Sequence, residues 1–172
     1  LQRPTRSTLP PRRLRTMRFG CLAASLACLA PVAAAQAPAH GVARLGTVEF
    51  KVACTPAAQQ QFNTAMALYH SFAWPQAVAA FTAIAAADPA CGMAHWGRAM
   101  SLLENPFVWP AGLTAQRLNE VDAALEAARA AGLATARERD YVVAVSVFLR
   151  DHATTPHAQR MQAFDAAMAQ LA

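Results

Sequence analysis

Glycine is scarce in this sequence, with seven residues in 172, and those present form neither a phosphate-binding loop nor a G-x-S-x-G nucleophile elbow. Motifs of paired carboxylates are missing as well. His70 and Ser71 are adjacent in the chain, which does not bring a hydroxyl onto an imidazole. The sequence therefore offers no motif for catalysis, and we expect neither an enzyme nor a cofactor.

Acidic residues are absent from the first 48 positions, while six of the fifteen arginines and lysines lie before residue 19. From residue 36 onward nine basic residues stand against ten acidic ones, so the body of the chain is close to neutral. The formal charge of +5 thus comes from the start of the chain and does not indicate a basic surface. We expect no nucleic-acid partner.

The leading apolar run, CLAASLACLA at residues 21–30, is shorter than the roughly 20 residues that a membrane-spanning helix needs. Met17-Arg18 precedes it and small residues follow, which is typical of a signal peptide over residues 17–35, cleaved after Ala35. Residues 1–16 are interpreted as a segment upstream of the true start, or as an unusually long basic leader. We therefore expect an exported protein, periplasmic or secreted, with no membrane span in the mature chain.

Residues 36–55 have the composition of a linker, with one short extended piece at 47–52 that suits a strand or an arm lying on the domain. From Thr55-Pro56 onward the sequence is helical, since threonine is a favoured N-cap and proline is tolerated at the first helical position. Apolar residues at helical spacing predict helices from residue 56 to about 71, from 74 to 87 and from 91 to 105. Further helices are expected from near Leu118 to Gly132, after Thr135 and near Thr155.

The chain repeats itself after 34 residues, because FNTAMALY at 62–69 aligns without gaps with WGRAMSLL at 96–103. A 34-residue period with two antiparallel helices per unit is typical of the tetratricopeptide repeat. The predicted fold over 56–172 is therefore all-α, an α-solenoid of tetratricopeptide-like helical hairpins. The expected core positions of these repeats are Phe62, Ala65, Leu68, Trp74, Ala77, Phe81, Pro89, Trp96, Ala99 and Leu102.

The period loosens after residue 104. Residues 105–114 form a longer connection, and Tyr141 repeats the Trp96 position after 45 residues, as an insertion of eleven would explain. A final amphipathic helix continues to the last residue with no following partner. We interpret the chain as the first part of a longer repeat array.

Two of the four cysteines, Cys21 and Cys28, leave with the signal peptide, and Cys54 and Cys91 remain. In an exported protein such a pair is more often a disulfide than two free thiols. An antiparallel hairpin also brings the start of its first helix, after Cys54, to the end of its second, before Cys91. We predict a Cys54–Cys91 disulfide.

A metal or cofactor site is the alternative for CGMAHWG at 91–97, where Cys91, Met93 and His95 alternate. On a helix, residues four apart share a face but residues two apart do not, so Cys91 and His95 converge only without Met93. His70 or His40 would have to supply a further ligand. We otherwise interpret His70 as a cap at the end of its helix, where a partly positive imidazole meets the helix dipole, or as a polar residue of a binding groove. The charged run ARERD at 136–140 is interpreted as a solvated first helical turn.

The order V-A-C, then F-N-x-A-x-A-L-Y-H-S-F, then D-P-A-C-G-M-A-H-W-G-R-A-M-S resembles a family of exported bacterial tetratricopeptide-repeat proteins over residues 45–171. The chain departs from that family at His95, where an aromatic residue is usual, and at Ala73. The resemblance implies an all-helical repeat scaffold in which more repeats normally follow, and it does not imply a reaction. We therefore expect an exported scaffold that binds a partner protein or peptide on its concave face, or alternatively a periplasmic metal- or cofactor-associated protein using His70, Cys91 and His95.

Overall fold

A computed structural model describes residues 45–105 and 113–171 of the chain. The predicted signal peptide at 17–35, the segment 1–16 and most of the connection at 105–114 lie outside these residues. The chain divides into two units, Leu1–Ala39 and His40–Ala172, and every described residue belongs to the second unit.

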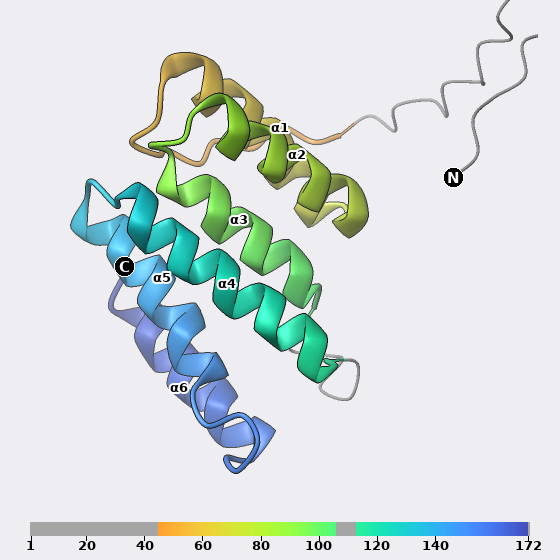
Figure 1. The fold of residues 1–172 in the computed structure, drawn as a ribbon, viewed down its shortest axis with the longest axis vertical. Helices are drawn as coiled ribbons and strands as arrows, with labels where there is room; N and C mark the ends of the chain where they lie inside the picture. Colours follow the sequence, from red (N-terminus) through yellow and green to blue (C-terminus); the bar gives the residue numbers. More distant parts are fainter. Residues whose placement is uncertain (1–44, 106–112, 172) are drawn as a thin grey trace, which may run out of the picture. The chain divides into compact units, whose positions relative to one another are not determined.

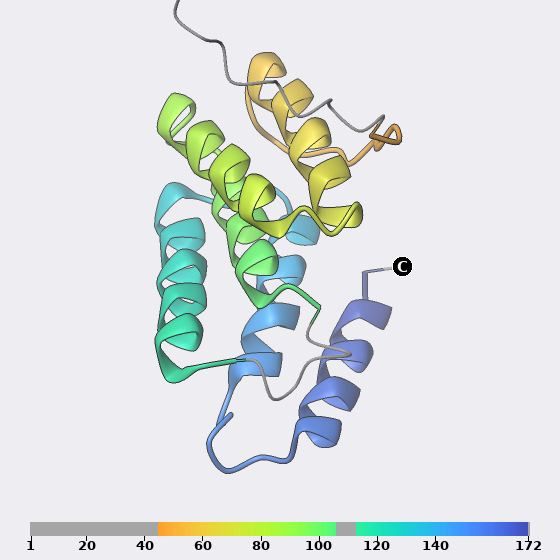
Figure 2. The same cartoon turned by 90° about the vertical axis from the view of Figure 1, so that its right-hand side faces the viewer.

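The described residues form helices and connecting segments, with no strand among them. Successive helices run antiparallel and pack side by side (Figures 1 and 2). The expected all-α class is confirmed for the described part of the chain. None of these described helices is both long and apolar enough to cross a membrane. The elements are α1 Pro56–His70, α2 Trp74–Ala87, α3 Gly92–Leu103, α4 Ala115–Ala131, α5 Ala136–Leu149 and α6 His157–Ala169.

Local capping signals explain where the helices begin and end. Thr55 accepts a hydrogen bond from the Ala58 N–H at the start of α1, where Pro56 occupies the first turn. Thr135 and Glu138 form a reciprocal capping box at the start of α5, as the sequence predicts. Gly132 ends α4 with a φ of 101°, a conformation that costs glycine little. The starts of α1 and α5 are therefore fixed by residues next to them in the chain.

Helix α3 is the centre of the unit, because it packs against both α2 and α4 and also contacts α1 and α5. Its glycines allow this close approach. A Cβ atom on Gly97 would lie 2.4 Å from the buried Phe81 ring of α2, and one on Gly92 would lie 2.2 Å from the Gly132 carbonyl oxygen beyond α4. Helix α3 therefore packs closely on both sides.

Most of the positions expected in the repeat core are buried, but three are not. Leu68 and Trp74 are half-buried, and Pro89 is exposed in the turn after α2. Trp74 stands at the first residue of its helix, where the layer ends, so less of the neighbouring helices covers it. The buried positions are Phe62, Ala65, Ala77, Phe81, Trp96, Ala99 and Leu102.

Candidate functional site

The predicted disulfide between Cys54 and Cys91 is present, with 4.9 Å between the two Cα atoms. It joins the residue before the N-cap of α1 to the residue before α3 and encloses the α1–α2 hairpin. Cys91 is fully buried. The antiparallel hairpin thus brings the two cysteines to the same end of the layer, as the sequence argument requires.

Asp88 lies beside the disulfide and accepts a hydrogen bond from the Thr55 N–H, at 2.8 Å from its Oδ2. This backbone bond, followed by one from the Thr55 hydroxyl, holds the pKa of the Asp88 carboxyl below its usual range. Cys54, Asp88 and Cys91 are the one group of three potential metal ligands within the described ranges. In the disulfide form the sulfurs are bonded to each other, and the group has no thiolate to offer a metal.

The structure does not bring His70, Cys91 and His95 together into that group. His70 ends α1, at the opposite end of the hairpin from Cys91. His95 is half-buried in the first turns of α3, and burial, followed by the charge of Arg98, lowers the pKa of its imidazole. Of these three, the disulfide occupies Cys91 and the two histidines lie apart from it.

The segment expected as a strand or arm at 47–52 is an extended arm, and side chains of α1 hold its backbone. Asn63 Oδ1 accepts from the Phe50 N–H at 3.1 Å, and Gln59 Oε1 accepts from the Val52 N–H at 2.9 Å. Gln59 Nε2 in turn donates to the Phe50 carbonyl at 2.8 Å. These contacts involve the main chain of the arm, so they recognise an extended backbone whatever its side chains.

Glu138 holds the far end of the arm. It is the one buried residue of the run at 136–140, whose other four residues are exposed as expected. The residue is buried, and its Oε1 accepts from the Ala53 N–H at 2.7 Å while Oε2 accepts from the Thr135 N–H at 3.1 Å. The capping box turns this carboxylate inward toward its own backbone, and the arm covers it there. One side chain therefore caps α5 and binds the arm.

The Phe50 ring lies against one aromatic residue from each of α1, α3 and α5. Its centroid is 5.6 Å from that of Phe62, 5.5 Å from Trp96 and 5.1 Å from Tyr141. These three are the equivalent positions that the 34- and 45-residue spacings relate. The Arg137 guanidinium lies 5.3 Å from the Phe50 ring centroid and 5.4 Å from that of Tyr141. The arm is thus anchored on equivalent positions of successive hairpins.

A cavity of about 310 Å³ lies between the arm and the start of α5. Its rim carries two cations, Lys51 and Arg137, neither of which forms an ion pair with any described residue. The only carboxylate in its lining, Glu138, is already bound to two backbone N–H groups. The cavity therefore favours apolar groups together with negative charge.

The groove residue proposed from the sequence, His70, lines a second cavity, of about 240 Å³, at the opposite end of α1. The turn between α1 and α2 forms one side of it and the end of α3 the other. The residues that line it are Tyr69, His70, Phe72, Trp74, Glu104 and Asn105.

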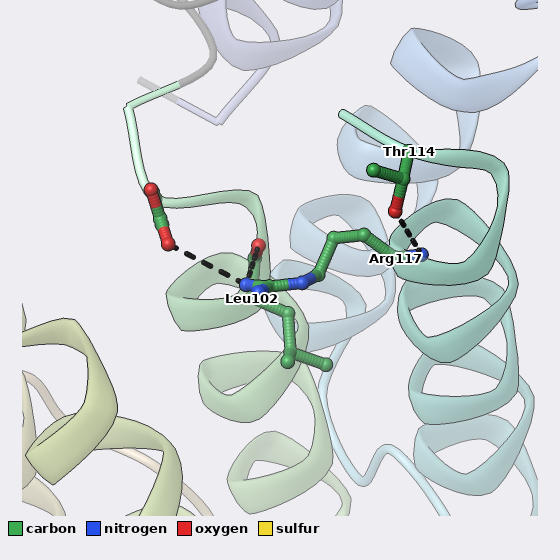
Figure 3. Close-up of polar contacts among 4 residues, drawn as sticks. Leu102, Thr114 and Arg117 are labelled. Atoms are coloured by element: carbon green, nitrogen blue, oxygen red, sulfur yellow. Dashed lines mark hydrogen bonds and ion pairs between the residues drawn. The ribbon is translucent and has the colours of Figure 1, made fainter. Parts of the chain in front are cut away.

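Arg117 of α4 holds the α3 end of this second cavity. Its Nη1 donates to the Leu102 carbonyl at 3.1 Å and lies 3.5 Å from Glu104 Oε1, while Thr114 caps the helix that carries it (Figure 3). Because Leu102 is in the last turn of α3, the guanidinium satisfies a carbonyl that the helix end leaves free.

Sequence reasoning missed two features. The first is the packing of the Phe50 ring, which depends on residues distant in the chain. The aromatic residues at the equivalent positions 62, 96 and 141 were the only sequence signal for it. Arg160 in α6 is buried without an acidic partner among the described residues, and it donates to the Phe148 carbonyl at 3.1 Å and stacks on the Phe148 ring. Its burial lowers the pKa of its guanidinium.

Comparison of the chain with protein-family models, with curated proteins and with solved structures finds no match in any of the three. The function is therefore argued from the site alone.

Proposed function

We propose that this chain is an exported, tetratricopeptide-repeat-like scaffold that binds an extended segment of a partner protein beside its own arm, in the cavity between the arm and α5. One observation carries the proposal. The face formed by α1, α3 and α5 already binds an extended segment, residues 48–53 of its own chain, through side chain-to-backbone hydrogen bonds and an aromatic anchor.

The cavity beside the arm supplies the room for a partner. Its lining combines the apolar surface of Phe50 and Tyr141 with the cations Lys51 and Arg137. A segment that carries an apolar side chain next to a carboxylate matches both features. The apolar side chain packs on the ring surfaces, and the guanidinium of Arg137 donates hydrogen bonds to the carboxylate. The proposed partner segment is therefore extended, apolar and acidic.

Export is part of the proposal, and the disulfide is compatible with it. Disulfides persist in oxidising compartments and are rare where thiols are kept reduced. Cys54–Cys91 closes the end of the first hairpin beside the arm. An oxidising compartment would therefore keep the arm in the position from which it forms one wall of the binding cavity.

Selection of binders from a displayed library of random linear peptides, using the oxidised full chain as bait, tests the proposal. We expect peptides that pair an apolar residue with Asp or Glu. Arg137→Gln should weaken them roughly tenfold, about 1.4 kcal/mol, because it removes the cation on the cavity rim. Arg150→Gln is the matched control, since Arg150 is equally exposed and lies outside the cavity lining. Failure to select any binder, or equal affinity for both variants, would contradict the proposal.

A further inference from the structure

The second cavity is surrounded by aromatic rings. Phe72 and Trp74 meet edge to face with centroids 5.6 Å apart, and Tyr69 and His70 do the same at 5.3 Å. Phe72 is 66% exposed, although large apolar side chains are normally covered. Aromatic rings attract cations over their faces, so this lining is suited to positive charge.

Hydrogen-bond acceptors from the end of α3 complete the lining. Asn105 Oδ1 is buried and has no hydrogen-bond partner among the described residues. Glu104 lies beside it, with Oε1 facing Arg117 at 3.5 Å and Oε2 without a partner in the described structure. The Glu104 side chain is 42% exposed, so its carboxylate is the acceptor that a donor in the cavity can reach.

Backbone strain lies on both sides of the same cavity. Phe72 has a φ of 59° and Glu104 a φ of 58°, in the left-handed region that residues with a side chain rarely adopt. Phe72 follows the end of α1, where the Ser71 and Ala73 N–H groups close the helix on the carbonyls of Ala67 and Leu68, and glycine is the usual residue at its position. A phenylalanine there pays for strained backbone and gains little burial. The ring at 72 therefore contributes little to the fold beyond its contact with Trp74.

We infer that this cavity binds a cationic group that carries N–H donors on a short apolar stem, an alkylammonium or a guanidinium. The N–H groups donate to the Glu104 carboxylate, and the stem lies against Phe72 and Trp74. Arg117 fixes Glu104 through one oxygen and leaves the other for the ligand. At about 240 Å³ the cavity takes a single side chain or a small amine, not a larger molecule.

This site lies apart from the one in the proposed function and has the opposite charge preference. The lining of the cavity beside the arm has two cations without an ion pair among the described residues and a carboxylate already bound to backbone N–H groups. The lining of the His70 cavity has the Glu104 carboxylate and no lysine or arginine. The two cavities share no lining residue. Each can therefore fail its test without affecting the other.

The test is a titration of the oxidised full chain, followed by the NMR shifts of the Trp74 indole and the Asn105 side-chain amide. The probes are n-butylammonium, the tripeptide acetyl-Ala-Lys-Ala-amide, and n-butanol as an uncharged match for the stem. We expect saturable shifts with at least one of the two cations and none with n-butanol. Shifts with the tripeptide alone would identify the ligand as a basic side chain of a polypeptide. Shifts with both cations would mean that free amines bind as well.

Four variants, two of them controls, make the result decisive. Glu104→Gln should weaken the binding at least fivefold, whereas Glu126→Gln, at an exposed carboxylate of α4 outside the cavity, should leave it unchanged. Phe72→Gly should remove most of the binding while the thermal midpoint stays the same or rises, because glycine relieves the positive φ. Arg137→Gln should not affect it. Absence of saturable shifts with both cations, or equal affinity in Glu104→Gln and Glu126→Gln, would overturn the inference.

Discussion

Removal of the Cys54–Cys91 disulfide is the sharpest test of how the first hairpin and the arm are held. The double variant Cys54→Ala, Cys91→Ala leaves every helix and every hydrogen bond of the arm in place. It removes the covalent link across a sequence separation of 37 residues, together with the two sulfur atoms. The change therefore acts mainly through the unfolded chain, which loses a closed loop.

The expected loss follows from the length of that loop. The chain-entropy relation gives about 4 kcal/mol at 25 °C for a separation of this size. For a domain of this size, such a loss lowers the thermal midpoint by roughly 15 °C. The fully buried Cys91 also loses packing contacts when its sulfur is removed, which adds to the destabilisation.

Urea unfolding followed by tryptophan fluorescence measures the loss directly, with the wild type and the double variant both kept under oxidising conditions. The same titration with dithiothreitol supplies the control. Reduction should bring the wild type close to the double variant and should leave the double variant unchanged. The slope of the free energy with urea should stay equal or rise, because the open unfolded chain exposes more surface.

A loss below about 1 kcal/mol would refute the reasoning, since it falls under the lower end of what loop closure of this length accounts for. Such a result would mean that the unfolded chain keeps the hairpin together without the bond. A loss that dithiothreitol fails to reproduce in the wild type would point to the packing of Cys91 as the cause. Either outcome would show that the covalent link is not the main source of stability for this hairpin.

Three further predictions concern packing, the arm and pH. Gly97→Ala should destabilise by about 1–3 kcal/mol in thermal unfolding, because its Cβ overlaps a buried ring, while Gly46→Ala, which meets nothing within 4 Å, should stay near wild type. Glu138→Ala should cost about 1–3 kcal/mol and speed hydrogen exchange at the Ala53 amide, because that N–H loses its acceptor; unchanged exchange would contradict this role. The pKa of Asp88 is lower in the folded state than in the unfolded state. Its carboxylate therefore stabilises the fold fully above the unfolded-state pKa, near 3.9, and this stabilisation is lost as the pH falls through the folded-state pKa. Asp88→Asn should therefore flatten stability against pH in that acid window, and an unaltered acid limb would show that the carboxylate contributes nothing there.

The parts of the fold that the sequence predicts well are those that neighbouring residues decide. Thr55-Pro56 and the capping box at Thr135 specify helix starts through contacts within one turn, so they can be read without the rest of the chain. The disulfide was predictable for a different reason. Once two antiparallel helices are assigned, their connectivity alone brings Cys54 to Cys91.

The candidate sites could be predicted only in part, because their geometry depends on contacts between distant residues. Glu138 belongs to a charged run that suggests solvent, and only the arm, whose Ala53 lies 85 residues earlier, explains why it is buried. His70 lines a cavity, and its neighbours there, Glu104 and Asn105, depend on where α3 ends. The spacing of apolar residues predicts a helix but does not specify the residue at which it ends.

The disulfide also limits how a partner can use the face that the arm covers. Each main-chain hydrogen bond of the arm contributes only about 1 kcal/mol net, so the segment around Phe50 opens more readily than the helices beneath it. Its other end cannot leave, because Cys54 is bonded to Cys91 and Ala53 is held by Glu138. A competing segment would have to displace an arm that the covalent bond keeps at high local concentration. We therefore expect the partner to occupy the cavity between the arm and α5, with the arm as one wall of the site.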